Sequence, residues 1–242
     1  MPLKYWQVKN QTETAADIYL YDEIGNWWDE TSAKGFKEEL DKIGDVQVLN
    51  IYINSPGGSV FEGMAIYNQL KRHKAQKNVY VDGIAASIAS VIALAGDKIV
   101  IPKNAFFMIH QPWAITWGSA SEFRRMADAL DTIEDGILNV YEGHSSLTRD
   151  EIKQMMADET WMTGEEALRH GFADEVGEEV QIAASIAQNE VWQKFKNAPK
   201  IEEHLTPEES PATGRVFDIR RVEVREKIQN RRKNAWTKSQ EC

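Results

Sequence analysis

The sequence predicts an α/β fold in which strands alternate with helices around a mostly parallel sheet. Short runs of β-branched and aromatic residues recur between positions 17 and 109, as is typical of strands in such a sheet. Between positions 55 and 170, Ser or Thr stands three residues before Glu at four places, a spacing that marks helix N-termini. Strand–helix–strand connections of this kind favour parallel pairing, with helices expected on both faces of the sheet.

The expected elements follow in chain order. Strands are expected at residues 17–24, 46–53, 79–82, 98–101 and 105–109. Helices are expected at residues 28–40, from Ser59, at 87–95, and from Ser119 to about Glu142, with two shorter helices starting at Thr148 and Thr163. The four capping pairs are Ser59/Glu62, Ser119/Glu122, Thr148/Glu151 and Thr163/Glu166.

The chain has 242 residues, of which 42% are hydrophobic, enough for one substantial core with an appendage. The composition becomes polar and charged near residue 185. We therefore expect a folded domain at residues 1–185 and a charged, flexible tail at residues 186–242. Residues 215–238 are strongly basic although the net charge is −10. This segment is either a solvated extension or a docking segment for an acidic partner, and the overall charge argues against nucleic acid as the main partner.

The cysteine content, the apolar stretches and the binding motifs of the sequence predict where the protein is located and whether it needs a cofactor. The single cysteine, Cys242, has no internal disulfide partner, which fits a cytoplasmic location. The longest apolar stretch, residues 84–95, is too short to cross a bilayer, and the first residues do not resemble a signal peptide, so no membrane partner is expected. There is no phosphate-binding Walker loop or metal-ligand cluster. We expect no cofactor, no metal and no ATPase activity within the chain.

Ser87 is the candidate nucleophile. It lies between the β-branched run ending at Val81 and the apolar run starting at Ile88, and so at a predicted strand–turn–helix junction. Such a junction exposes a side chain and directs the free N–H groups of the helix toward the atom that it attacks. A serine at this position requires a base and an oxyanion site nearby.

Candidates for both are present. Gly57 and Gly58 precede the helix that starts after Ser59, and their N–H groups are free to face a cleft, although a tight turn without a ligand would use the same residues. His110 ends the apolar run 105–109, where it is either a structural histidine or the base for Ser87. Ser55 and Ser59 are weaker nucleophile candidates, because one precedes a proline and the other is an expected helix cap.

Four motifs resemble those of the ClpP-type serine proteases. They are Asn54-Ser55-Pro56-Gly57-Gly58, Gly83-x-Ala85-Ala86-Ser87, Met108-Ile109-His110-Gln111-Pro112 and Glu166-Ala167-x-x-x-Gly171-Phe172-x-Asp174. The match covers about residues 15–180. It implies a ClpP/crotonase-like fold, Ser87 as nucleophile, His110 as general base, and the backbone N–H groups of Gly58 and Ile88 as the oxyanion hole.

The acid of the triad departs from the family pattern. Ala157-Asp158-Glu159-Thr160-Trp161 places Glu159 where an aspartate is usual, with Asp158 one position earlier. One alignment with the family pattern matches both Trp161 and the pair Glu166-Ala167, and this alignment favours Glu159 as the acid. A glutamate can orient a histidine, as it does in some hydrolases. Asp158 remains an alternative, as does a solvated Glu159 with no catalytic part.

The resemblance also implies partners. Members of the family assemble into homo-oligomeric rings, often stacked heptamers, joined through a handle helix that falls here on residues 121–142. These rings receive protein substrates from an AAA+ ATPase. Relatives encoded by tailed phages resemble prohead maturation proteases that cleave scaffold or capsid proteins, in the host cytoplasm or the assembling prohead. Residues 16–25, Trp161-Met162-Thr163, the short connection before His110 and the long tail favour this phage group.

Two other classes stay open. A crotonase-type acyl-CoA enzyme shares the fold and the paired backbone amides, but it does not need Ser87 and His110. An inactive ring scaffold or adaptor would keep the assembly and use the basic tail for docking.

Overall fold

The computed structural model describes residues 6–25, 32–179 and 195–199. The chain divides into two compact units, Met1–Ile201 and Glu202–Cys242, and all described residues belong to the first unit. Its described part is an α/β structure with a mostly parallel sheet, which confirms the predicted fold class.

In the part of the chain that the structure describes, eight strands form one sheet. The path along it is β1-β2-β3-β4-β5-β8, while β6 pairs with β4 and β7 pairs with β6. The pairs β1/β2 and β6/β7 are antiparallel and the others are parallel. The strands are β1 (Trp6–Lys9), β2 (Ala15–Tyr21), β3 (Val48–Ser55), β4 (Gln76–Ala86), β5 (Lys98–Pro102), β6 (Phe106–Ile109), β7 (Thr160–Thr163) and β8 (Glu175–Gly177).

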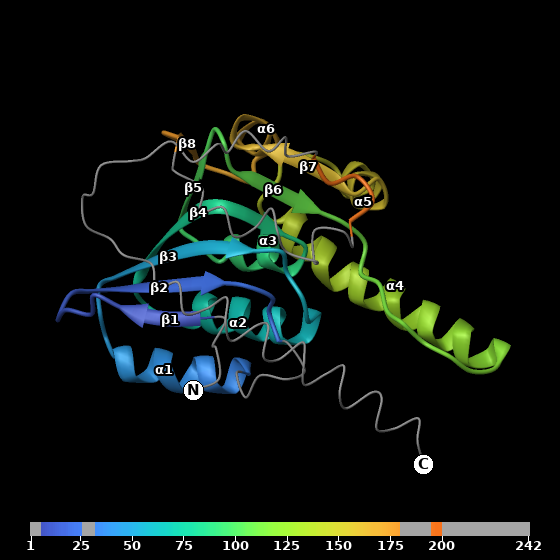
Figure 1. Ribbon diagram of the computed structural model, residues 1–242, viewed down its shortest axis with the longest axis horizontal. Helices are drawn as coiled ribbons and strands as arrows, with labels where there is room; N and C mark the ends of the chain where they lie inside the picture. Colours follow the sequence, from blue (N-terminus) through green and yellow to red (C-terminus); the bar gives the residue numbers. More distant parts are fainter. Residues whose placement is uncertain (1–5, 26–31, 180–194, 200–242) are drawn as a thin grey trace, which may run out of the picture. The chain divides into compact units, whose positions relative to one another are not determined.

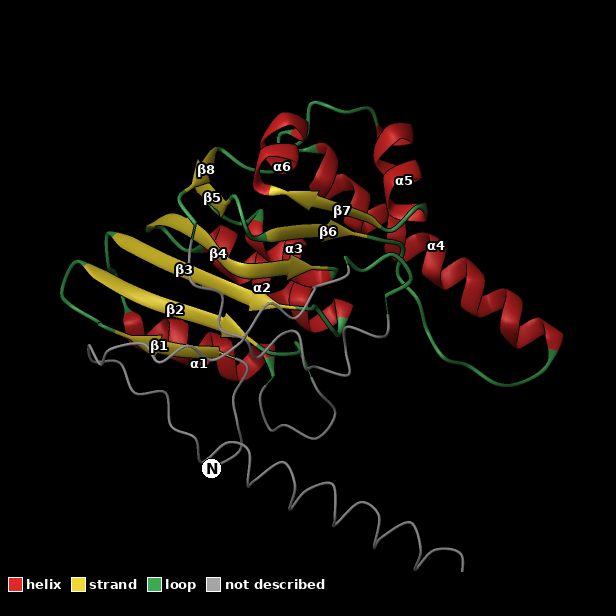
Figure 2. Ribbon diagram, turned by 45° about the horizontal axis from the view of Figure 1, so that its top comes forward, coloured by secondary structure: helices red, strands yellow, loops and turns green. Residues whose placement is uncertain are grey.

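Helices connect the strands. Figures 1 and 2 show α1 and α2 on one face of the sheet, with α3 following β4. The helices are α1 (Ala33–Ile43), α2 (Val60–Arg72), α3 (Ile88–Ala93), α4 (Ala120–Glu142), α5 (Arg149–Ala157) and α6 (Gly164–His170).

Side chains along β2 alternate between the hydrophobic core and the opposite face of the sheet. Ile18 and Leu20 are buried toward the helices, in the same core as Phe36 of α1. Tyr19, between them, points to the other face, where its ring stacks on that of Tyr52 of β3 with centroids 4.8 Å apart. This face of β1–β3 is not covered by a helix among the described residues, so the expected covering on both faces is not found there (Figure 2).

Most predicted strands and helices lie within a few residues of their observed positions, but three strands were missed. β1, β7 and β8 are only three or four residues long, too short to show a period. The capping pairs that start at Ser119, Thr148 and Thr163 are present. The pair Ser59/Glu62 is not formed: Ser59 is the N-cap of α2, but the Glu62 carboxylate accepts a hydrogen bond from the backbone N–H of Ala33 instead.

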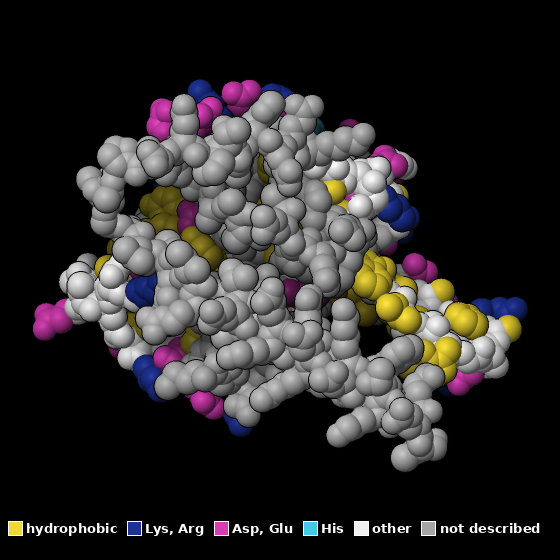
Figure 3. Space-filling view, viewed as in Figure 1, with side chains coloured by type: hydrophobic (Ala, Val, Ile, Leu, Met, Phe, Trp, Pro, Cys, Tyr) yellow, Lys and Arg dark blue, Asp and Glu magenta, His cyan; other side chains and the backbone are white. Residues whose placement is uncertain are grey.

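Helix α4 extends away from the sheet (Figure 1). Its hydrophobic side chains are buried only toward its C-terminal end, at Ile137, Leu138, Val140 and Tyr141. Phe123, near the start, is 50% exposed. Together with Trp113, Ile115 and Trp117 just before the helix, it leaves hydrophobic side chains at the surface, which Figure 3 shows around the projecting part of the molecule.

The predicted tail, residues 186–242, falls largely outside the described residues, as does the basic segment 215–238. The boundary near residue 185 therefore stays a prediction. Within the predicted tail, residues 195–199 are described, and they belong to the first compact unit.

Candidate active site

Sheet register brings Ser87 and His110 to the same edge. Ala86, the last residue of β4, pairs with Met108 of the parallel strand β6. Parallel strands end at the same side of a sheet, so the residues that follow, Ser87 and His110, emerge together. Strand β3 ends nearby in the same way, since Ser55 pairs with Ala85, and the glycine turn Gly57-Gly58 follows it.

Ser87 adopts a conformation that is rare for a side-chain-bearing residue. Its φ is 56° and its ψ is −130°, between the end of β4 and the first turn of α3. Such backbone strain costs on the order of 1–3 kcal/mol and is concentrated at functional sites. Three hydrogen bonds fix it: the Ser87 N–H donates to the Met108 carbonyl, the Ser87 carbonyl accepts from Ser90 Oγ, and Ser90 Oγ lies 2.7 Å from the Tyr141 hydroxyl.

The Ser87 hydroxyl and the His110 imidazole are in direct contact. Ser87 Oγ lies 2.7 Å from His110 Nε2, within hydrogen-bond distance. Burial lowers the pKa of His110 below its usual value, and the negative charge of Glu159 offsets part of this effect. A lowered pKa keeps the imidazole neutral near pH 7, the state in which it can accept a proton from the serine.

The glycine turn packs directly against Ser87. A Cβ on Gly57 would lie 2.6 Å from the Ser87 Cβ, and a Cβ on Gly58 would lie 2.1 Å from the Ile24 carbonyl oxygen. Both glycines also have positive φ, 90° and 146°. Ile24 holds the turn in place, because its N–H donates to the Gly57 carbonyl and its carbonyl accepts from the Ser59 N–H.

The two amides expected to form an oxyanion hole are available. Within the described residues, the N–H groups of Gly58 and Ile88 have no hydrogen-bond acceptor. Ile88 is the first residue of α3, and first-turn N–H groups have no partner inside their own helix. Amides in this state can receive a negatively charged oxygen.

Strand β7 places Glu159 opposite His110. β7 runs antiparallel to β6 with Thr160 paired to Ile109 as the last pair, and Glu159 and His110 are the next residues beyond this pair. Glu159 is 9% exposed and has a positive φ of 51°. Its charge acts on His110, yet within the described residues no hydrogen bond joins the two side chains.

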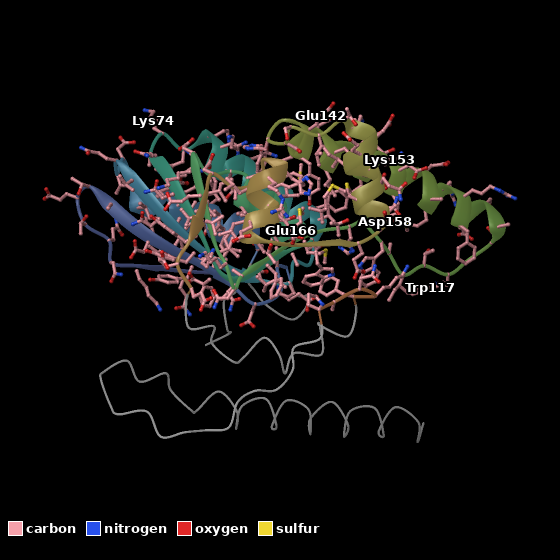
Figure 4. The ribbon with its side chains drawn as sticks, turned by 90° about the horizontal axis from the view of Figure 1, so that it is seen from above. Lys74, Trp117, Glu142, Lys153, Asp158 and Glu166 are labelled. Atoms are coloured by element: carbon pink, nitrogen blue, oxygen red, sulfur yellow. The ribbon has the colours of Figure 1, made fainter. Side chains whose placement is uncertain are left out.

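Asp158, the alternative acid, lies at the end of α5 and is exposed (Figure 4). Its carboxylate accepts hydrogen bonds from Gln154 Nε2 at 3.0 Å to each oxygen, and its carbonyl accepts from Asn197 Nδ2. Glu159 is therefore the buried acid beside the histidine. Ser55 has a structural part, since its hydroxyl donates to the Asp22 carbonyl and accepts from the Gly57 N–H.

Ser87, His110 and Gly58 line one cleft of about 250 Å³. Trp113 also lines the cleft, as expected for the aromatic residues that follow His110 in the sequence. Three further residues were not foreseen from the sequence. Ile24 lines the cleft, Tyr141 supports the serine turn through Ser90, and Phe195 enters the cleft from a part of the chain distant in sequence.

The described residues offer neither a metal-binding cluster nor a membrane-spanning helix. They contain no group of three or more His, Cys, Asp or Glu side chains placed to hold a metal ion. None of their helices is both long enough and apolar enough to span a bilayer.

The region that resembles known proteins contains Ser87, His110 and Glu159. Residues 8–180 match the family model described as Clp protease. The chain is similar to the ATP-dependent Clp protease proteolytic subunit of Deinococcus radiodurans, with 34% identity over 140 residues, 57% of this chain and 68% of that protein. It is 34% identical over 140 residues to the subunit of the same name from Bacteroides fragilis, covering 57% and 67%. With proteolytic subunit 1 of Salinibacter ruber, identity is 30% over 148 residues, covering 60% and 63%.

Proposed function

The chain belongs to the Clp protease family, and from this premise we propose that it is a serine endopeptidase with Ser87 as nucleophile and His110 as general base. The contact of 2.7 Å between Ser87 Oγ and His110 Nε2, at a serine held in a strained turn, is the observation that carries the proposal.

In the first half of the reaction, neutral His110 takes the hydroxyl proton as Ser87 Oγ attacks a peptide carbonyl. The imidazolium then gives that proton to the leaving amine, and the acyl group remains on Ser87. Water, activated by the same imidazole, releases the acyl group and restores the enzyme. The lowered pKa of His110 supports this use as a base at neutral pH.

The negative oxygen that forms during attack would bind the N–H groups of Gly58 and Ile88. Ile88 lies at the positive end of the α3 backbone dipoles, which adds a favourable electrostatic contribution. Glu159 would stabilise the His110 cation through its charge, and we favour it over Asp158 because it is buried beside the imidazole.

For substrates, we propose unfolded protein chains delivered by an AAA+ ATPase to a ring of these subunits. The relatives reported above are named proteolytic subunits of ATP-dependent proteases, which favours this role over the phage head maturation expected from the tail and the opening residues. The Ser87–His110 contact also favours a peptidase over a crotonase-type enzyme or an inactive scaffold, neither of which requires it.

The decisive experiment compares Ser87→Ala with the wild-type chain for peptide cleavage and for labelling by a fluorophosphonate. We expect the variant to fold and to lose both, with cleavage reduced by several orders of magnitude. Ser59→Ala is the matched control, because Ser59 lines the same cleft and its side chain makes no cap hydrogen bond. Labelling that persists in Ser87→Ala would exclude Ser87 as the nucleophile.

A second experiment separates the two substrate classes. The wild-type chain is incubated with a folded, tagged protein, with and without an AAA+ unfoldase and ATP, and in parallel with phage scaffold protein. Degradation that needs the unfoldase supports the delivered-substrate role. Specific cleavage of scaffold at a few sites without ATP would support head maturation instead.

A further inference from the structure

Residues 195–199 lie against the candidate active site although they are 85 or more positions from His110 in the sequence. In Figure 1 they form the short orange segment beyond β7 and α5. Phe195 lines the same cleft as Ser87, Gly58 and His110. Any peptide that reaches Ser87 must therefore share this cleft with the segment.

The Phe195 ring fills apolar space beside the catalytic imidazole. Its centroid is 5.8 Å from that of His110 with an interplanar angle of 73°, and 5.4 Å from that of Trp161 at 84°. Edge-to-face geometry of this kind is favourable for aromatic pairs. Phe195 also packs against a small buried cluster formed by Ile84, Ala86 and Met108.

The backbone of the segment binds the candidate acid. The Lys196 N–H donates to Glu159 Oε2 at 3.0 Å, and the Asn197 N–H donates to Glu159 Oε1 at 2.7 Å. Trp161 Nε1 donates to the same Oε1 at 3.3 Å. Asn197 is anchored further, because its Nδ2 donates to the Asp158 carbonyl at 2.8 Å.

These contacts show whether residues 195–197 lie in the cleft or only hold Glu159 from behind. A segment that only supported the acid would pack behind Glu159, away from the cleft. Here Phe195 lines the cleft that contains Ser87, while the two amides hold both oxygens of the Glu159 carboxylate. Phe195 therefore shares the cleft with Ser87, while the amides that follow it bind the acid.

We propose that residues 195–197 act as an internal inhibitor, in which Phe195 occupies the substrate cleft and the following amides bind Glu159. The proposal rests on the proposed serine peptidase function. Substrate binds only when the segment leaves, so its apparent affinity is reduced by the fraction of molecules in which the cleft is occupied. Displacement of the segment, by substrate or by a partner, is then the activating step.

The test uses the full-length chain and two variants that weaken different contacts. Phe195→Ala removes the ring, and Asn197→Pro removes the N–H that donates to Glu159. For each, kcat and KM are measured on a short fluorogenic peptide, together with the second-order rate of fluorophosphonate labelling. We expect KM to fall and the labelling rate to rise by about tenfold, with kcat little changed. Phe61→Ala is the matched control, since Phe61 is an exposed aromatic residue outside the cleft.

The outcomes are distinct. A drop in kcat in both variants would show that the segment positions Glu159 for catalysis and would overturn the proposal. Unchanged KM and labelling in folded variants, checked by thermal melting, would overturn it as well. If the wild-type chain and both variants all fail to label and to cleave peptides, the serine peptidase function itself fails and the inhibitor proposal falls with it.

Discussion

At position 110, two opposing effects act on one imidazole. Burial favours its neutral form, and the charge of Glu159 favours its protonated form, with burial the larger effect. Ser87 has a strained backbone conformation, and in this conformation its hydroxyl contacts the His110 imidazole. In the proposed mechanism, both features favour proton transfer from Ser87 to His110.

The pH dependence of activity follows from this balance. Because His110 must be neutral to act as a base and its pKa is lowered, kcat/KM should rise with pH through a value below the usual 6.5 of histidine and then level off. Glu159→Gln removes the charge that raises this pKa. The acid limb should then shift to still lower pH while the plateau rate falls.

Measurement of kcat/KM from about pH 4.5 to 8 on wild-type and Glu159→Gln chains checks both directions. Asp158→Asn is the control, because Asp158 is exposed and bound to Gln154. A shift produced by Asp158→Asn and not by Glu159→Gln would assign the acid to Asp158.

Among the secondary-structure elements, the α2/α3 contact lies beside the amide of Ile88, one of the two proposed oxyanion donors. Gly63 of α2 faces Ile88, the first residue of α3, and a Cβ on Gly63 would lie 2.2 Å from Ile88 Cγ1. Ile88 is buried and has little room to move. Because Gly63 has no side chain, the start of α3 can lie close to α2, and this close packing fixes the position of the Ile88 N–H.

Gly63→Ala should push the start of α3 away from α2. We expect the free energy of unfolding to fall by about 1–3 kcal/mol and kcat to fall by at least about tenfold, because the Ile88 amide moves from its oxyanion position. Chemical denaturation and steady-state kinetics measure the two effects.

Gly136→Ala provides the matched comparison within another helix. A Cβ on Gly136 of α4 would meet no atom within 4 Å, so alanine should raise the free energy of unfolding by about 0.5–1 kcal/mol. Equal effects of the two substitutions would contradict the packing argument.

For the whole molecule, the hydrophobic side chains around the start of α4 predict association with other copies. Trp117 is 85% exposed and Trp113 is 57% exposed, and patches of this kind on a single chain commonly mark interfaces. Assembly through this region agrees with the ring proposed above.

Trp117→Ser together with Phe123→Ser should reduce the assembled mass measured by sedimentation velocity, because each serine removes apolar area from the association surface. Leu168→Ser, which changes an exposed residue of α6, should leave the mass unchanged. An assembled mass that is the same in all three chains would place the interface elsewhere.

Local patterns in the sequence were sufficient where the interaction itself is local. Thr163 and Glu166 form their capping box because both partners belong to one helical turn. Ser59 and Glu62 have the same spacing, but Glu62 binds the N–H of Ala33, 29 residues away, which no local pattern reveals. The same limit explains why short β7 was missed.

The sequence by itself determined the α/β class, the order of the strands that carry Ser87 and His110, and the glycine turn beside them, because each depends on hydrophobic periodicity or on a motif. Only the tertiary structure decided which acid faces His110, since that follows from the antiparallel register of β6 and β7. It alone also placed Phe195 in the cleft. Contacts between segments far apart in a chain depend on how their surfaces pack together. The periodic pattern shows which side chains are buried, but it does not show which distant segment they contact.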